Sequence, residues 1–180
     1  MNEIGVRRTL YLDPVSVANP WPVTIEKPAP SIPIPATSRS SFSVAAVSGD
    51  AVVIFGREGV LIKVTEIAIA KPSTQETILI IKRSTADTGG TSTVQTNIAM
   101  DSSDPLSGTV VRAYTAAPTT GTSLGNIARC VVAVGDVLIL SFGGKGKCPT
   151  LRNNSECLAI NVDATGTLAG WLEWVEEAGQ

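Results

Sequence analysis

Residues 77–98, TILIIKRSTADTGGTSTVQTNI, predict two β-strands joined by a turn. Isoleucine, threonine and valine are frequent at both ends of this stretch, and branching at Cβ favours extended backbone. Between them, Asp87–Gly90 reads DTGG, in which an aspartate and two glycines favour a tight turn. Because Ile78–Ile81 is apolar at every position, we expect the first strand to be packed on both faces.

The same succession of β-branched runs and turn residues continues through residues 41–180. Val137–Leu140 is a second run that is apolar on both faces, and Gly135-Asp136 marks the turn before it. Short strands spaced about ten residues apart, with no amphipathic helix between them, are typical of a β-sandwich or jelly roll. We therefore expect an all-β domain here. Its strands are predicted near residues 42–47, 51–55, 60–70, 77–83, 92–98, 109–115, 128–134, 137–142, 156–162 and 171–177.

Residues 1–40 differ in composition and predict an extended, proline-rich arm. Most of the 11 prolines lie in this part of the chain, as in Ile25–Ala36, IEKPAPSIPIPA. Proline fixes φ and lacks a backbone donor, which favours polyproline II over a helix or a central strand. The arm also carries much apolar surface, so we expect it to lie against its own domain or against a neighbouring subunit. The arm residues that we expect to bind a partner are Leu10, Tyr11, Trp21, Ile25, Ile32 and Ile34.

The composition argues against nucleic acid and membranes as partners. Apolar residues make up 43% of the chain and charged residues only 17%, against about 25% charged in ordinary domains. Such a surface is either covered by neighbouring subunits or made neutral by serine and threonine. The net charge of -2 supplies no basic field for nucleic acid. No apolar run approaches the ~20 residues of a membrane span, and the N-terminus lacks a signal-peptide pattern, so synthesis in the cytoplasm is expected.

The reactive side chains argue against an enzyme. The sequence contains no histidine, which removes Ser-His-Asp and Cys-His hydrolases and histidine-ligated metal sites. Cys130, Cys148 and Cys157 have spacings that suit neither a disulfide framework nor a metal site, so we expect free thiols. We therefore predict no catalytic residues, no metal ligands and no cofactor.

A glycine-rich stretch, Gly143–Cys148, is the nearest approach to a phosphate-binding loop. A Walker A loop needs a glycine five residues before its Gly-Lys pair and a serine or threonine after it, but Ser141 and Cys148 stand at those places. The stretch is predicted to be a basic loop tip. Contact of Lys145 and Lys147 with an acidic partner surface is the alternative.

The C-terminal region combines acidic and aromatic residues. In a strand, Glu173 and Glu177 share one face and Glu176 lies on the other, which fits solvated edge charges better than a catalytic acid pair. Trp171 and Trp174 are candidate interface residues, because tryptophan buries a large area in cores and in subunit contacts. A sugar-stacking platform is the alternative for this pair.

Four segments resemble small β-structured virion proteins of tailed bacteriophages. They are ILIIKRSTADTGGTSTV at 78–94, GTVVRAYTAAPTTGTSLGN at 108–126, VAVGDVLILSFG at 132–143 and LAGWLEWVEE at 168–177. The resemblance implies a head decoration or cement protein, a head fibre or a tail component. It further implies a jelly-roll-like domain in a homotrimer, and no catalytic residues.

The resemblance leads to two expectations. The first is a non-enzymatic capsid decoration or cement protein on the surface of the virion, which binds the major capsid protein or another virion protein through its arm and its trimer contacts. The second is a receptor-binding or carbohydrate-binding module of a fibre, tail or baseplate, with the loops near Asp87, Pro118 and Lys145 as its contact surface.

Overall fold

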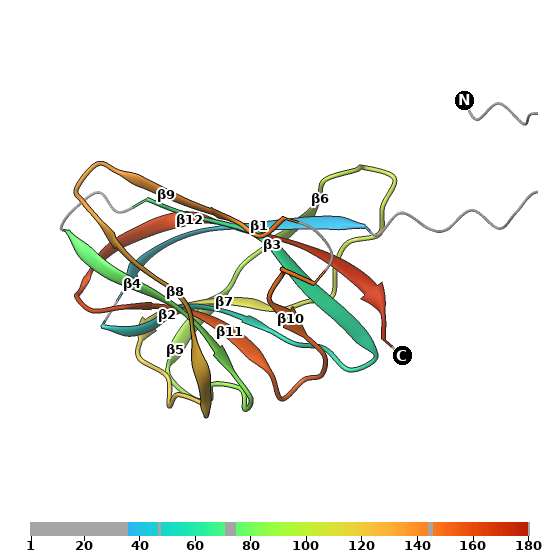
Figure 1. Ribbon diagram of the computed structural model, residues 1–180, viewed down its shortest axis with the longest axis horizontal. Helices are drawn as coiled ribbons and strands as arrows, with labels where there is room; N and C mark the ends of the chain where they lie inside the picture. Colours follow the sequence, from blue (N-terminus) through green and yellow to red (C-terminus); the bar gives the residue numbers. More distant parts are fainter. Residues whose placement is uncertain (1–35, 47, 71–74, 144–145, 180) are drawn as a thin grey trace, which may run out of the picture. The chain divides into compact units, whose positions relative to one another are not determined.

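The computed structural model describes residues 36–46, 48–70, 75–143 and 146–179, and within these ranges it is all-β without a helix (Figure 1). Every strand pairing in it is antiparallel. The strands are β1 (Thr37–Ala46), β2 (Gly49–Phe55), β3 (Val60–Ala70), β4 (Glu76–Arg83), β5 (Thr91–Val94), β6 (Asn97–Ala99), β7 (Val111–Ala116), β8 (Ser123–Val132), β9 (Val137–Ser141), β10 (Thr150–Leu151), β11 (Cys157–Val162) and β12 (Gly166–Ala178).

The strands form two six-stranded sheets. The first sheet has the order β10-β3-β12-β1-β6, and β9 also pairs with β3. The second sheet has the order β5-β7-β2-β11-β4-β8. Many strands that follow one another in the chain are thus divided between the sheets, as β1 and β2 are, and β8 and β9 also give one strand to each (Figure 1).

One hydrophobic core is shared by the two sheets, and alternation along the strands places most of its side chains. In β2, Val52 and Ile54 belong to this core, whereas Val53 points to the other face of the second sheet. In β12, Leu172 and Trp174 belong to the core from the first sheet. Burying side chains of this size removes enough apolar surface from water to hold the sheets together.

The predicted strands are confirmed in their main positions, with three corrections. The segment predicted at 92–98 is two strands, because β5 pairs with β7 in the second sheet and β6 pairs with β1 in the first. The short strand β10 was not predicted, since Thr150–Leu151 is too brief to show a pattern. The strand predicted to begin at residue 42 begins at Thr37, because Ser38 and Ser40 fill inward positions that their polarity concealed.

The predicted arm residues Leu10, Tyr11, Trp21, Ile25, Ile32 and Ile34 lie outside the described residues. The extended arm and the jelly-roll connectivity therefore stay predictions. In the part of the chain that the structure describes, no helix is long and apolar enough to span a membrane.

Candidate functional site

A second, smaller apolar cluster lies on the outer face of the second sheet. Val53, Tyr114, Cys157 and Ala159 form it, and Phe55 packs against it. These residues alternate along β2, β7 and β11 with residues of the main core. These side chains are buried although they point away from the main core, so another part of the chain must lie over them. The segment after β4 forms part of this covering layer. The Cys157 thiol lies 3.9 Å from the Thr85 carbonyl oxygen.

The covering segment is anchored by a buried ionic cluster. The Arg83 guanidinium binds Asp50 through Nε at 2.8 Å and Nη2 at 2.7 Å, and its Nε lies 3.3 Å from Asp87. Arg83 also donates to the Gly121 carbonyl at 2.9 Å, while the Gly121 N–H donates to Asp87 at 2.8 Å. Asn161 donates to Asp50 at 2.6 Å. The cluster therefore ties the loop after β4 to the loop before β8.

Asp87 is the less favourably paired carboxylate of this cluster, because it shares the Arg83 guanidinium with Asp50. Its Oδ2 has no hydrogen-bond donor among the described residues. Burial raises the pKa of Asp87 to about 6, and hydrogen bonding with Asp50 and the charge of Asp50 add to the increase. The Gly121 N–H and Arg83 act in the opposite direction without cancelling it. A proton on Asp87 is therefore held more tightly in the folded chain than in the unfolded chain.

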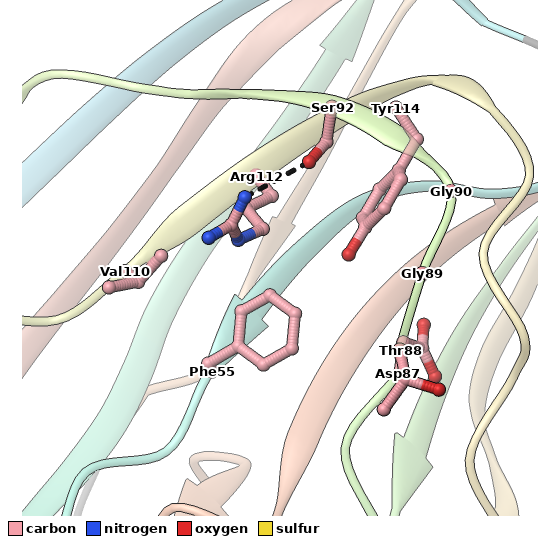
Figure 2. Close-up of a pocket in the computed structure, with 9 residues that line it drawn as sticks. All are labelled: Phe55, Asp87, Thr88, Gly89, Gly90, Ser92, Val110, Arg112 and Tyr114. Carbon is pink, nitrogen blue, oxygen red and sulfur yellow. Dashed lines mark hydrogen bonds between the residues drawn. The ribbon is translucent and has the colours of Figure 1, made fainter.

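A pocket of about 520 Å³ opens beside the covering segment. Figure 2 shows Arg112 and Tyr114 reaching from β7 toward Phe55, with the Asp87–Gly90 segment on the other side. Arg112 donates to the Ser92 hydroxyl at 3.1 Å, and it makes no ion pair with any described residue. The guanidinium therefore keeps donors available for a ligand.

The loops near Asp87 and Pro118, which the sequence marked as a contact surface, lie next to each other. Thr88 and Thr119 exchange backbone hydrogen bonds of 3.0 and 2.7 Å. Lys145, the third predicted contact, lies outside the described residues. The structure also places Phe55 and Arg112 at this site, which the sequence did not identify. The alternation in Val111–Tyr114, VRAY, was the available signal, because it sends an arginine and a tyrosine to one face.

Exposed apolar residues lie on β8 and β9, which are edge strands of the two sheets, and on the loop that joins them. Val131 is 62% exposed and Val137 is 57% exposed. We call this set the β8–β9 edge. Its members are Leu124, Ile127, Val131, Val134, Val137 and Ile139.

A second exposed apolar set, the β5–β6 edge, lies on the strands at the other ends of the two sheets and on the loop after them. Its most exposed member is Leu106, at 72%. The set consists of Val94, Ile98, Met100, Leu106 and Val110.

Glu176 holds the loop of the β5–β6 edge in place. Its Oε1 accepts hydrogen bonds from the hydroxyls of Ser107 and Thr109, the latter at 2.5 Å, and from the Trp174 indole at 3.4 Å. Arg57 lies 3.6 Å from Oε2. Burial alone would raise the pKa of Glu176, but these hydrogen bonds and the charge of Arg57 together lower it below its ordinary value.

The two predicted interface tryptophans lie on opposite faces of β12. Trp174 is 0% exposed and belongs to the main core, one of the two packing roles that its size suggested. Trp171 is partly exposed on the outer face of the first sheet, where its indole donates to Glu66 at 2.8 Å. The Arg39 guanidinium lies 5.3 Å from its ring centroid and binds Glu173 at 2.7 Å.

The acidic and sulfur-containing residues form no recognisable reactive group in the described ranges. Glu173 and Glu177 share the outer face of the first sheet, where they bind Arg39 and Lys63, and Glu176 points the other way, as predicted. The prediction that they are solvated edge charges is wrong, because β12 lies between β3 and β1 and all three carboxylates are partly buried. No group of three His, Cys, Asp or Glu residues among those described could hold a metal ion. Cys130 and Cys157 are free thiols, and burial raises the pKa of the Cys157 thiol to about 12.

Comparison with models of protein families, with curated proteins and with solved structures found no match.

Proposed function

We propose that this chain is a non-enzymatic structural subunit of a phage particle, a decoration or cement protein that assembles with copies of itself and with a capsid protein. The observation that carries the proposal is the pair of exposed apolar edges. Single exposed apolar residues are ordinary on protein surfaces. A group of them on edge strands and on the loops beside these strands instead favours a surface that another protein covers.

The two edges are made of different residues, and this difference favours a ring. A contact between the β8–β9 edge of one copy and the β5–β6 edge of the next is heterologous, and heterologous contacts that close generate cyclic oligomers. A homotrimer is the simplest such ring that agrees with the resemblance to phage virion proteins. In this proposal the proline-rich arm extends to the capsid surface, and binding is multiplied over many symmetric copies.

The oligomer is tested by placing a charge on the β8–β9 edge. The double variant Val131→Asp/Val137→Asp should convert a trimer into a monomer in light scattering coupled to gel filtration, because it would bury two unpaired carboxylates in the contact. Ser43→Asp is the matched control, since Ser43 is exposed on β1 and lies beyond the residues of β1 that pair with β6. A wild-type chain that stays monomeric at ~100 μM would contradict the ring.

The arm is tested separately. Removing residues 1–35 should abolish binding to expanded phage heads while the folded oligomer remains intact by circular dichroism and light scattering. Binding of the truncated oligomer to heads as tight as that of the full chain would refute the role of the arm without affecting the apolar edges.

A further inference from the structure

We propose that the pocket between Phe55, Arg112 and the Asp87–Gly90 segment binds an acidic sugar, a hexose unit that carries one carboxylate. Such a site goes beyond the proposed function, because a subunit that only assembles needs no ligand pocket. The sugar site also does not depend on the two apolar edges. Of the residues that line the pocket, only Val110 also belongs to an apolar edge.

The pocket has the size of a small-molecule site and is open to solvent. Its volume of about 520 Å³ falls within the roughly 300–1,000 Å³ of ligand pockets in general. The entrance lies on an outer sheet face, which suits one unit of a longer chain better than an enclosed metabolite. A polysaccharide can place one sugar in such a hollow while its neighbours stay in water.

Arg112 indicates a carboxylate. The guanidinium presents a planar fork of donors that matches a carboxylate with two parallel hydrogen bonds. Its known partner, the Ser92 hydroxyl, uses only Nη1 and carries no charge. An uncompensated cation on a pocket wall is satisfied best by an anionic ligand.

The same surroundings limit the ligand to a single negative charge. Asp87 itself lines the pocket and shares Arg83 with Asp50, so an ionised pair leaves this side of the pocket negative. Among the described residues that line the pocket, Arg112 is the only cation. A phosphate dianion carries one more negative charge than Arg112 can neutralise, and the Asp50–Asp87 pair would repel that excess charge. A carboxylate carries a single negative charge, which Arg112 alone neutralises.

The remaining lining favours a sugar ring over an acidic peptide. The Phe55 ring offers an apolar surface for the C–H face of a hexose, and the Tyr114 hydroxyl in Figure 2 points into the space between Phe55 and Arg112. Ser92 and Thr88 add hydroxyl groups to the wall. Several small donors and acceptors around one aromatic face suit a ligand with many hydroxyls.

The wall formed by Gly89 and Gly90 is rigid in spite of its glycines. Both residues have positive φ, at 66° and 70°, a conformation that other residues adopt only with strain. A Cβ on Gly90 would lie 2.7 Å from the Ala116 carbonyl oxygen, so the segment lies directly against the chain that follows β7. Because the backbone is fixed before a ligand arrives, little conformational entropy is lost on binding.

The proposal is tested by amide NMR titration of the full chain with methyl glucuronide and, as the neutral match, methyl glucoside. Methyl glucuronide should shift the amides of Gly89, Gly90 and Arg112, and its affinity should exceed that of methyl glucoside by about tenfold. Absence of shifts at these amides with ~20 mM methyl glucuronide would overturn the proposal. Equal affinity for the two sugars would overturn the role of Arg112.

Variants and a third probe separate the remaining explanations. Arg112→Gln should lower the affinity for methyl glucuronide about tenfold, Arg112→Lys should lower it less, and Arg129→Gln, at an exposed position on β8, should leave it unchanged. The amide spectrum of each variant reports whether it is folded. If acetate binds as tightly as methyl glucuronide, the pocket recognises only a carboxylate, as on an acidic peptide, and the sugar assignment is wrong.

Discussion

Asp87 and Glu176 are both buried carboxylates that hold a surface loop, yet their pKa values move in opposite directions. Glu176 is surrounded by neutral donors and faces Arg57 alone, so ionisation improves every contact it makes. Asp87 must share Arg83 with Asp50, so its ionisation places a second negative charge in the same buried space. Burial acts to raise both pKa values, and the donors and charges around each carboxylate decide whether the final value lies above or below the ordinary one.

The two carboxylates support different surfaces of the domain. Asp87 supports the wall of the pocket, and Glu176 supports the loop of the β5–β6 edge. Acidification protonates Asp87 first and at little cost, since the folded chain already favours that form. Glu176 retains its charge to lower pH. The pocket wall and the apolar edge should therefore respond to acid in different pH ranges.

Removal of Arg83 should give the largest effect, because it leaves Asp50 and Asp87 buried without a countercharge. We expect Arg83→Met to lower the free energy of unfolding by about 3–5 kcal/mol in urea titrations. Arg152→Met, at an exposed position in the loop before β11, should change it by less than about 0.5 kcal/mol. Similar losses of unfolding free energy in the two variants would show that Arg83 stabilises the fold no more than an exposed arginine does.

Asp87→Asn should reveal the pH dependence that belongs to the pocket wall. The pKa of Asp87 is raised from 3.8 to about 6 in the folded chain, so its contribution to stability is greatest below pH 3.8 and declines as pH rises through about 6. Asparagine cannot ionise. The free energy of unfolding of the variant should therefore rise relative to that of the wild type across this range, by roughly 3 kcal/mol.

Urea titrations of both chains in steps from acidic to neutral pH measure this difference. The stability of the variant relative to the wild type should rise with pH and reach a plateau above about pH 6. A difference that is flat over this range would show that Asp87 ionises normally in the folded chain.

Glu176→Gln should have the smallest effect and the opposite pH dependence. The amide keeps an oxygen for Ser107 and Thr109 but replaces charge-assisted hydrogen bonds with neutral ones, a loss of about 1 kcal/mol at neutral pH. Because the folded-state pKa is lowered, the contribution of Glu176 is present above its unfolded pKa and disappears as pH falls below it. The loss in the variant should therefore shrink in acid.

Glu177→Gln is the control for this variant, because Glu177 binds Lys63 on a more exposed part of the same strand. Urea titrations should show a smaller loss for it, less than about 0.5 kcal/mol. If Glu177→Gln costs as much as Glu176→Gln, the hydroxyl donors around Glu176 add no stability beyond that of a surface ion pair.

Much of the strand pattern could be predicted because local chemistry determined it. Ile78–Ile81 is apolar at every position, and β4 lies between two strands of its sheet, as such a run suggests. The break between Val94 and Asn97 was not visible. Only long-range pairing reveals it, since Val94 pairs with Arg112 in one sheet and Asn97 with Ser40 in the other.

The candidate pocket was less predictable for the same reason. The sequence marked the turn at Asp87, but Phe55 and Arg112 reach that turn through strand pairings across the second sheet. No local signal specifies which turn a given arginine will face. The absence of histidine was the most useful functional signal, because a missing residue type needs no fold to interpret.

The pairing of β1 with β12 has a consequence for how the chain folds during synthesis. Thr37–Ala46 lies between β6 and β12 in its sheet, and it pairs along its whole length with residues 166–175. Contacts between such distant segments form slowly, because a long loop must close before they can contribute energy. Until residues 166–178 have been synthesised, β1 lacks the strand with which it pairs along its whole length. Its core residues Phe42 and Val44 then remain available for aggregation or for a chaperone.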